Sequence, residues 1–170
     1  MNKQIDWACN KMNKQIDWAC NEDALVSFDR EPVVAVRVIL PNMSAFEKKS
    51  VAKYPFCCKK PLRVLIYDNK NFKQYLFEIK EGYCWDGASV PRFFWRIIGA
   101  NTAAEFLIPS LIHDVICENK NYINYDRELS SRVFRALLIA SGVSSFKANV
   151  MYTAVNTYQM FCDWGLEYNK

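Results

Sequence analysis

The chain contains a single histidine, His113, which is followed directly by Asp114. Histidine is the side chain whose ordinary pKa lies nearest to neutral pH, so it is well suited to accept and release protons there. His113 lies in a mostly apolar stretch that predicts a helix. A lone histidine on such a face is also common in protein cores, where it hydrogen-bonds to a neighbour. The sequence supports both interpretations.

A metal site is one alternative for this histidine. His113 and Cys117 are four residues apart and so share one face of a helix, and Cys84 could join them to bind zinc. The chain has no CxxC motif and no second histidine, which argues against zinc. Oxygen ligands for a hard divalent cation form a better set. The candidates are Asp86, Asp114 and Glu128.

A Ser-His-Asp arrangement is a second alternative, with Ser89 as nucleophile, His113 as base and either Asp86 or Asp114 as the acid. Such a serine needs a base within hydrogen-bonding reach and N–H donors for an oxyanion. A helix that begins near Pro91 could supply those donors. Ser89 also fits the N-cap of that helix, and this structural role is the favoured explanation for it.

Acid–base chemistry by His113, with Asp86 as an orienting or ligand-binding carboxylate, is the third alternative. The Asp86–Gly87 pair is expected at a junction between a strand and a helix, where sites are frequent. We expect Asp86 and His113 to lie within about 8 Å, across a pocket or through one bridging group. The phosphate-binding motifs GxGxxG and the P-loop are absent from the sequence, which argues against nucleotide chemistry of those kinds.

Four segments in the first half of the chain predict β-strands that would position Asp86. Val33–Leu40 is rich in β-branched residues and lies between two prolines. Leu62–Tyr67 and Phe72–Ile79 flank a polar break and predict a hairpin. Gly82–Trp85 is expected to continue the same sheet.

After this point the pattern becomes helical. A short helix is expected over residues 91–98, and the Thr102–Glu105 capping box begins the helix that carries His113. Asp126 can cap a third helix, and a fourth is expected to begin near Ser144. The stripe predicted to be buried on this last helix is Phe146, Val150, Ala154, Tyr158 and Phe161.

Strands followed by helices favour an α+β fold, in which an N-terminal antiparallel sheet with a hairpin is covered by a C-terminal bundle of about four helices. A chain of 170 residues suits one domain. Residues 1–11 and 12–22 are near-identical copies, and one repeat this short cannot stack into a solenoid. We therefore treat residues 1–22 as a tandem duplication outside the structural unit, and residues 23–170 as the domain.

Composition limits the partners. Between Glu47 and Arg63 the chain carries a run of lysines with embedded aromatics, a mixture found in single-strand binders. The net charge of only +4 makes nucleic acid an improbable partner, so a solvated connector is the favoured interpretation. No apolar run is long enough for a membrane span. Seven cysteines without paired spacing, and no secretory signal, predict reduced thiols in a cytoplasm.

The ordered motifs resemble a phage and prophage family known as domain of unknown function 1353. Its pattern has an Asp-x-x-Ser-x-Pro-Arg turn, a helix with His-Asp-x-x-Tyr, and a later helix with Arg-x-x-Ala-Asp. The resemblance covers Gly82 to about Tyr158. It implies a phage or prophage origin and adds functional weight to five residues. These are Asp86, Ser89, Arg92, His113 and Asp114.

Two positions depart from the family pattern. Cys117 stands where the family has tyrosine, which weakens the zinc interpretation, and Ser131 stands where the later aspartate would fall. Glu128 lies one helical turn before Ser131 and could partly replace that aspartate. We assign Asp86, Ser89, His113 and Asp114 as candidate catalytic residues. The candidate substrate-binding residues are Arg92, Arg127 and Glu128.

The resemblance implies no reaction. The first hypothesis is a phage accessory protein, in the host cytoplasm or the virion, with a small polar site that hydrolyses its substrate through Asp86, His113 and Asp114. The alternative is a non-catalytic virion component, or an inhibitor that binds a host defence factor. Under either hypothesis the expected partner is a host or phage protein, and the sequence leaves the oligomeric state open.

Overall fold

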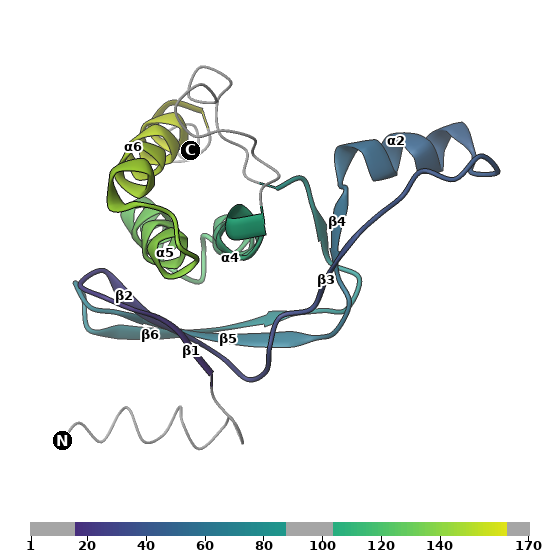
Figure 1. Cartoon of the computed structure of the whole chain (residues 1–170). Coiled ribbons are helices and arrows are strands. Elements are labelled where there is room, and N and C mark those ends of the chain that lie inside the picture. Colours follow the sequence, from purple (N-terminus) through teal and green to yellow (C-terminus); the bar gives the residue numbers. More distant parts are fainter. Residues whose placement is uncertain (1–15, 88–103, 163–170) are drawn as a thin grey trace.

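The computed structural model describes residues 16–87 and 104–162, and apart from one helix at Ala45–Lys53 its strands precede its helices, which confirms the α+β class (Figure 1). Two sheets occur in the described part of the chain, and both are antiparallel. The strands are β1 (Ile16–Cys20), β2 (Ala24–Phe28), β3 (Val34–Val36), β4 (Phe56–Cys58), β5 (Leu62–Asp68), β6 (Lys73–Ile79) and β7 (Cys84–Trp85). The helices are α2 (Ala45–Lys53), α4 (Ala104–Glu118), α5 (Arg127–Ala140) and α6 (Ser145–Cys162).

The main sheet has the strand order β1-β2-β5-β6. It contains the predicted hairpin, in which β5 and the edge strand β6 pair from Leu62 opposite Ile79 to Asp68 opposite Lys73. The hairpin prediction is therefore confirmed. Alternating apolar side chains of both strands are buried, because one face of this sheet packs under the helices.

The second copy of the repeat is part of this sheet. Its residues Ile16–Cys20 form β1, which pairs with β2, and Trp18 packs its ring 5.4 Å from that of Phe28. The domain thus includes Ile16–Cys20 and does not begin at residue 23. The repeat was set aside because one short copy cannot stack on itself, but a five-residue segment can still complete the edge of a sheet.

A smaller sheet has the order β3-β4-β7, and it corrects two strand predictions. The predicted strand Val33–Leu40 shrinks to β3, and Val38–Leu40 beyond it is exposed. The segment before Asp86 forms β7, which pairs with β4 instead of extending the hairpin sheet. Strand pairs that are this short and this far apart in sequence have no local sequence pattern from which they could be predicted.

The lysine-rich segment contains a helix where a connector was predicted. Ser44 caps α2 by accepting the Glu47 backbone N–H, and the Glu47 carboxylate accepts the Ser44 backbone N–H in return. Residues 33–60, which hold β3, α2 and β4, reach out from the body of the molecule (Figure 1). We call residues 33–60 the arm.

Helices α4 and α5 pack on one face of the main sheet, and α6 packs on α5 on that same side (Figure 1). Asp126 caps α5 by accepting the Leu129 backbone N–H, as predicted, and Gly142 follows this helix with a φ of +92°. The helix expected over residues 91–98, and the start of the Thr102–Glu105 capping box, lie outside the described residues. Within the described ranges, none of the helices is long and apolar enough to cross a membrane.

The predicted stripe of α6 is only partly confirmed, because Ala154 is buried and Val150 is half-buried. Phe146, Tyr158 and Phe161 are exposed, whereas the face towards α5 carries mostly small or flexible side chains. Small residues let two helices approach closely, so the largest apolar residues remain outside the contact. The buried apolar residues of α6 are Ala148, Met151, Ala154 and Val155.

Candidate functional site

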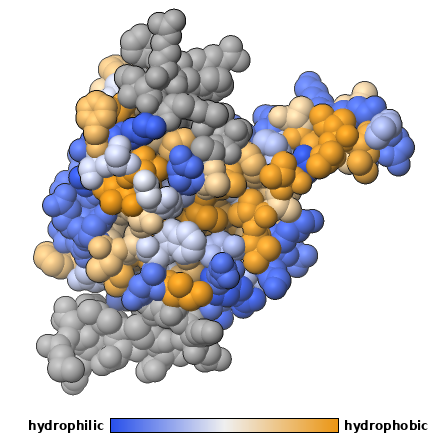
Figure 2. Space-filling model, viewed as in Figure 1, coloured by the Kyte–Doolittle hydropathy of each residue, from blue (hydrophilic) through white to orange (hydrophobic). Residues whose placement is uncertain are grey.

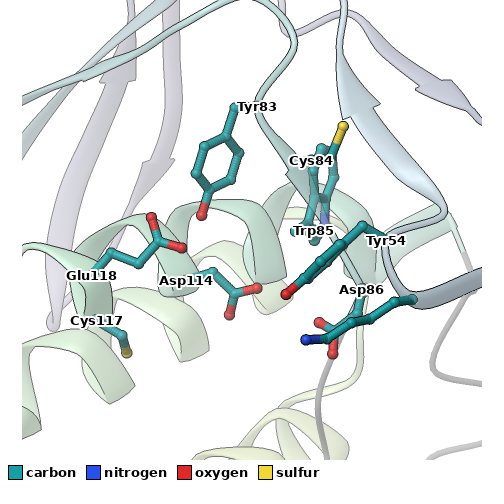
Figure 3. A pocket seen from close by; sticks show the side chains of 9 residues that line it. Tyr54, Tyr83, Cys84, Trp85, Asp86, Asp114, Cys117 and Glu118 are labelled. Carbon is teal, nitrogen blue, oxygen red and sulfur yellow. The ribbon is translucent and has the colours of Figure 1, made fainter. Parts of the chain in front are cut away.

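A cleft of about 280 Å³ lies where the base of the arm, strand β7 and helix α4 meet. Figure 3 shows its side chains, which include three carboxyl groups and three aromatic rings. Its lining residues are Lys53, Tyr54, Tyr83, Cys84, Trp85, Asp86, Asp114, Cys117 and Glu118.

Strand β7 is held against α4 by Trp85. The Trp85 ring is buried beside Phe56 of β4, and its indole Nε1 donates a hydrogen bond to Ser110 Oγ of α4 at 3.1 Å. Asp86 follows Trp85 directly, so this contact sets the strand end beside the helix. Asp114 and Glu118 are four residues apart on α4 and therefore present their carboxyl groups on the same face.

Asp114 is a carboxyl group of the cleft whose pKa is raised by its surroundings. Burial raises the pKa of Asp114, the negative charges of Asp86 and Glu118 raise it further, and a hydrogen bond from His113 opposes them. Figure 3 shows Asp114 between Glu118 on one side and Asp86 on the other. A carboxyl group of raised pKa beside a second carboxyl group is suited to act as a general acid.

Tyrosine hydroxyl groups complete the polar wall. Burial, together with the nearby Glu118 and Asp114 carboxylates, raises the pKa of Tyr83 far above its ordinary range, so its hydroxyl stays a donor. Lys53 lies at the exposed side, with its Nζ 4.9 Å from the centre of the Tyr54 ring. The cleft therefore combines acid groups, hydroxyl donors and one cation within reach of solvent.

His113 lies behind Asp114 and does not line the cleft. Its Nδ1 is 3.5 Å from Asp114 Oδ1, and its Nε2 is 3.6 Å from Cys117 Sγ and 3.0 Å from the Gln159 amide nitrogen. Its ring packs 5.2 Å from that of Phe134. Asp114 contacts His113 and also lines the cleft that holds Asp86.

Gln159 ties this histidine to α5. The Gln159 carbonyl oxygen lies 3.2 Å from Ser131 Oγ and 3.3 Å from Ser130 Oγ, and both serines are buried. Hydroxyl groups accept as well as donate hydrogen bonds, so the amide of Gln159 can face the imidazole with either end. The amide oxygen of Gln159 can accept a hydrogen bond from a protonated imidazole, and the amide nitrogen can donate one to a neutral imidazole.

The charge state of His113 depends on its two neighbours on α4. Burial lowers the pKa of His113, but the Cys117 sulfur and the Asp114 carboxylate raise it more, to about 10. The histidine is therefore protonated at neutral pH, and its Nδ1–H donates a hydrogen bond to the Asp114 carboxyl group.

The free energy of unfolding should depend on pH through His113. Its pKa rises from 6.5 to about 10 on folding, so its contribution is complete below pH 6.5 and is lost as the pH rises to 10. From pH 6.5 to 10, the wild type should lose at least about 1.4 kcal/mol more stability than His113→Gln, the equivalent of one pKa unit. Urea unfolding at several pH values measures this, and two parallel curves would contradict it.

The other predicted site residues lie elsewhere. Ser89 and Arg92 are outside the described residues, so the Ser-His-Asp arrangement has no geometry to report. Arg127 donates to the Asn156 backbone carbonyl at 2.7 Å, which joins α5 to α6. Glu128 pairs with Lys70 at 2.7 Å and with Arg132 at 3.5 Å. Neither Arg127 nor Glu128 lines the cleft, so their assignment to substrate binding is not supported.

The candidate metal sets are also not assembled. Residues 16–87 and 104–162 contain no group of three or more acidic, histidine or cysteine side chains arranged for a metal ion. Cys84 cannot complete a zinc site with His113 and Cys117, because it forms a disulfide with Cys57. Glu128 cannot join Asp86 and Asp114, because it faces Lys70, and Glu118 takes that place in the cleft.

The disulfide corrects the prediction that the cysteines are all reduced. The register of β4 and β7 sets Cys57 opposite Cys84, with their Cα atoms 4.1 Å apart. The two residues are separated by 27 positions, so no short spacing motif predicts that these cysteines form a disulfide. Cys20, Cys58 and Cys117 are free thiols.

Several lining residues escaped sequence analysis. Glu118 could have been found, because it follows Asp114 by one helical turn. Tyr54 and Tyr83 carried no signal, since the base of the arm and the chain before β7 meet α4 only in the folded molecule.

Comparison with known proteins gives a family but no activity. The family model described as "Protein of unknown function (DUF1353)" matches residues 62–155, which is more than half of the chain. An "Uncharacterized protein y4jT" from Sinorhizobium fredii (strain NBRC 101917 / NGR234) is 44% identical over 82 residues. That match covers 48% of this chain and 23% of the relative, so the chain corresponds to less than a quarter of the relative's length. No solved structure matches the chain.

Proposed function

The chain belongs to the DUF1353 family, and we propose that it is a hydrolase in which Asp86 and Asp114 act as an acid–base pair. The supporting observation is the pairing of a half-buried carboxyl group of raised pKa with a second carboxyl group in one solvent-accessible cleft. Sites that cleave bonds with water often use two carboxyl groups whose surroundings differ in this way.

In the proposed reaction, Asp114 gives its proton to the leaving group as the bond to that group breaks. Asp86 accepts a proton from the water molecule that attacks the other side of the bond. The hydroxyl groups of Tyr54 and Tyr83 can hydrogen-bond to oxygen atoms of the substrate. His113 does not touch the substrate; it holds Asp114 in position through its Nδ1.

On the basis of the motif resemblance, we propose that the protein is encoded by a phage or prophage. We propose that it works in the host cytoplasm or the virion. Disulfides persist outside reducing cytosol, so the Cys57–Cys84 pair favours the virion of these two.

The experiment is a turnover assay of the full chain against ester, glycoside, phosphodiester and peptide chromogenic substrates. Asp114→Asn and Asp86→Asn should each lower kcat/KM by about 10²–10⁴-fold. Glu78→Gln is the matched control, because it removes an exposed carboxylate of β6 and should leave kcat/KM unchanged. Melting temperatures separate lost chemistry from lost folding. Turnover that survives in both aspartate variants, or none by the wild type on all four classes, would count against the proposal.

The alternative is a non-catalytic module that binds a host or phage protein. Its supporting observation is the buried network of His113, Gln159 and Ser131, which joins three helices without reaching the cleft. Under this alternative, His113→Gln would lower the melting temperature, and the Asp86 and Asp114 variants would change no measured reaction.

A further inference from the structure

The arm exposes apolar side chains that the body of the molecule leaves uncovered. Phe46 of α2 is 83% exposed, Val36 is 65% exposed and Val38 is 66% exposed, and about half of the surface of Ile39 and of Leu40 is also exposed. Figure 2 shows hydrophobic residues gathered along the arm on the face in view. Single exposed apolar residues are ordinary, but a contiguous group of them marks a surface that binds something.

The same segment carries the positive charge of the chain. Residues 33–60 hold six basic side chains and one acidic one, whereas the whole chain has a net charge of only +4. The rest of the molecule is therefore slightly acidic. The single acid of the arm, Glu47, is occupied in the cap of α2. A surface that is both apolar and basic is complementary to a partner surface that has negative charges on the outside and apolar groups below them.

The arm presents these side chains on a fixed frame. The Arg37 backbone N–H donates to the Pro55 carbonyl at 2.7 Å, and the Arg37 guanidinium donates to the Tyr54 carbonyl at 3.0 Å, which joins the two limbs. Lys48 Nζ donates to the Pro41 carbonyl at 3.1 Å, so the start of α2 is tied to the turn before it. The exposed segment Val38–Leu40 is thus held by contacts at both of its ends.

We propose that the arm docks the protein on an anionic membrane surface, with Val38–Leu40 and Phe46 in the lipid interface and Lys48 and Lys49 at the headgroups. Apolar side chains gain by entering the boundary between headgroups and acyl chains, and basic side chains beside them gain from anionic lipids. None of the described helices can span a membrane, so the association is peripheral.

Shape and residue type favour a membrane over the other occupants. The apolar side chains lie on an arm that projects from the body, which suits insertion into a soft, extended surface (Figure 1). A single-stranded nucleic acid would stack on aromatic rings, but the exposed stretch Val38–Leu40 carries none, and Phe56 of this basic segment is buried in the small sheet. A second copy of the chain and a nucleic acid therefore become outcomes of the test.

The test is cosedimentation of the full chain with vesicles of phosphatidylcholine, alone or with about a third phosphatidylglycerol. The wild type should bind the anionic vesicles, and added salt should weaken this binding. Ile39→Asp combined with Leu40→Asp should reduce the bound fraction at least about tenfold, because charged groups resist entry into the interface. Lys48→Glu combined with Lys49→Glu should remove the preference for anionic lipid.

Phe146→Asp is the matched control, since Phe146 is 70% exposed on α6, outside the arm, and its replacement should leave the bound fraction unchanged. All variants change exposed or half-exposed positions, and melting temperatures confirm that they fold. Equal binding to neutral and anionic vesicles, or none, would overturn the proposal. A dimer that Ile39→Asp dissociates, with no vesicle binding, would assign the surface to a second copy. Displacement from vesicles by a single-stranded oligonucleotide that binds more tightly would assign it to nucleic acid.

Discussion

Replacing Arg132 with methionine is expected to lower the free energy of unfolding by about 3–5 kcal/mol. The guanidinium Nη2 of Arg132 lies 3.0 Å from Asp68 Oδ1, and Asp68 is completely buried at the end of β5. The methionine side chain fills most of the space but leaves the Asp68 carboxylate without its cation. A buried charge that loses its partner destabilises far more than the intact pair stabilises.

The control uses the same region of the molecule. Lys70 and Arg132 both contact Glu128, but the Lys70–Glu128 pair is 59% and 46% exposed. Lys70→Met should therefore cost less than about 1 kcal/mol. Adding Asp68→Asn to Arg132→Met should recover part of the loss, because no charge then remains buried. Equilibrium unfolding in urea measures the wild type and all three variants. Equal losses for Arg132→Met and Lys70→Met would refute this account of Asp68.

Local patterns predicted the elements that form through local contacts. The hairpin of β5 and β6 has two apolar runs around a polar turn, and α5 combines the Asp126 cap with regularly spaced apolar residues. Helix α2 also had a local signal, the capping box of Ser44 and Glu47. The polar lysine-rich sequence after it obscured this signal, because α2 buries little besides Val51.

Elements that form through distant contacts were not predictable in the same way. Strands β3, β4 and β7 have two or three residues each and are stabilised by pairing across gaps of twenty residues or more. Such pairs carry no periodicity of their own. The domain start was misplaced for a related reason, since β1 acquires its role only by pairing with β2.

The site residues likewise fall into those that local sequence predicts and those that depend on distant contacts. Asp86 and Asp114 stood out as polar residues at a turn and beside the only histidine, and the structure brings both to the cleft. The contact between His113 and Gln159 could not be predicted, because Gln159 reaches it from α6, 46 positions further along the chain. Tertiary contacts therefore decide that His113 supports the cleft from behind.

The disulfide between Cys57 and Cys84 is expected to stabilise the protein by about 2–4 kcal/mol, because it closes a loop in the unfolded chain. It also holds β7 to β4, where the register pairs only two positions, Phe56 with Trp85 and Cys57 with Cys84. Loss of the bond should therefore loosen the strand that carries Asp86 into the cleft, as well as lower the stability.

Urea unfolding with and without dithiothreitol tests this expectation. The wild type should lose about 2–4 kcal/mol in the reductant, and the double variant Cys57→Ser, Cys84→Ser should show that loss already and no further response. Cys20→Ser is the control, since Cys20 is an exposed free thiol and its replacement should change stability by less than about 0.5 kcal/mol. The buried thiol of Cys58, whose pKa is raised by burial, should remain unalkylated until the chain unfolds. Alkylation of both Cys57 and Cys84 in unfolded, unreduced protein would show that the bond is not formed.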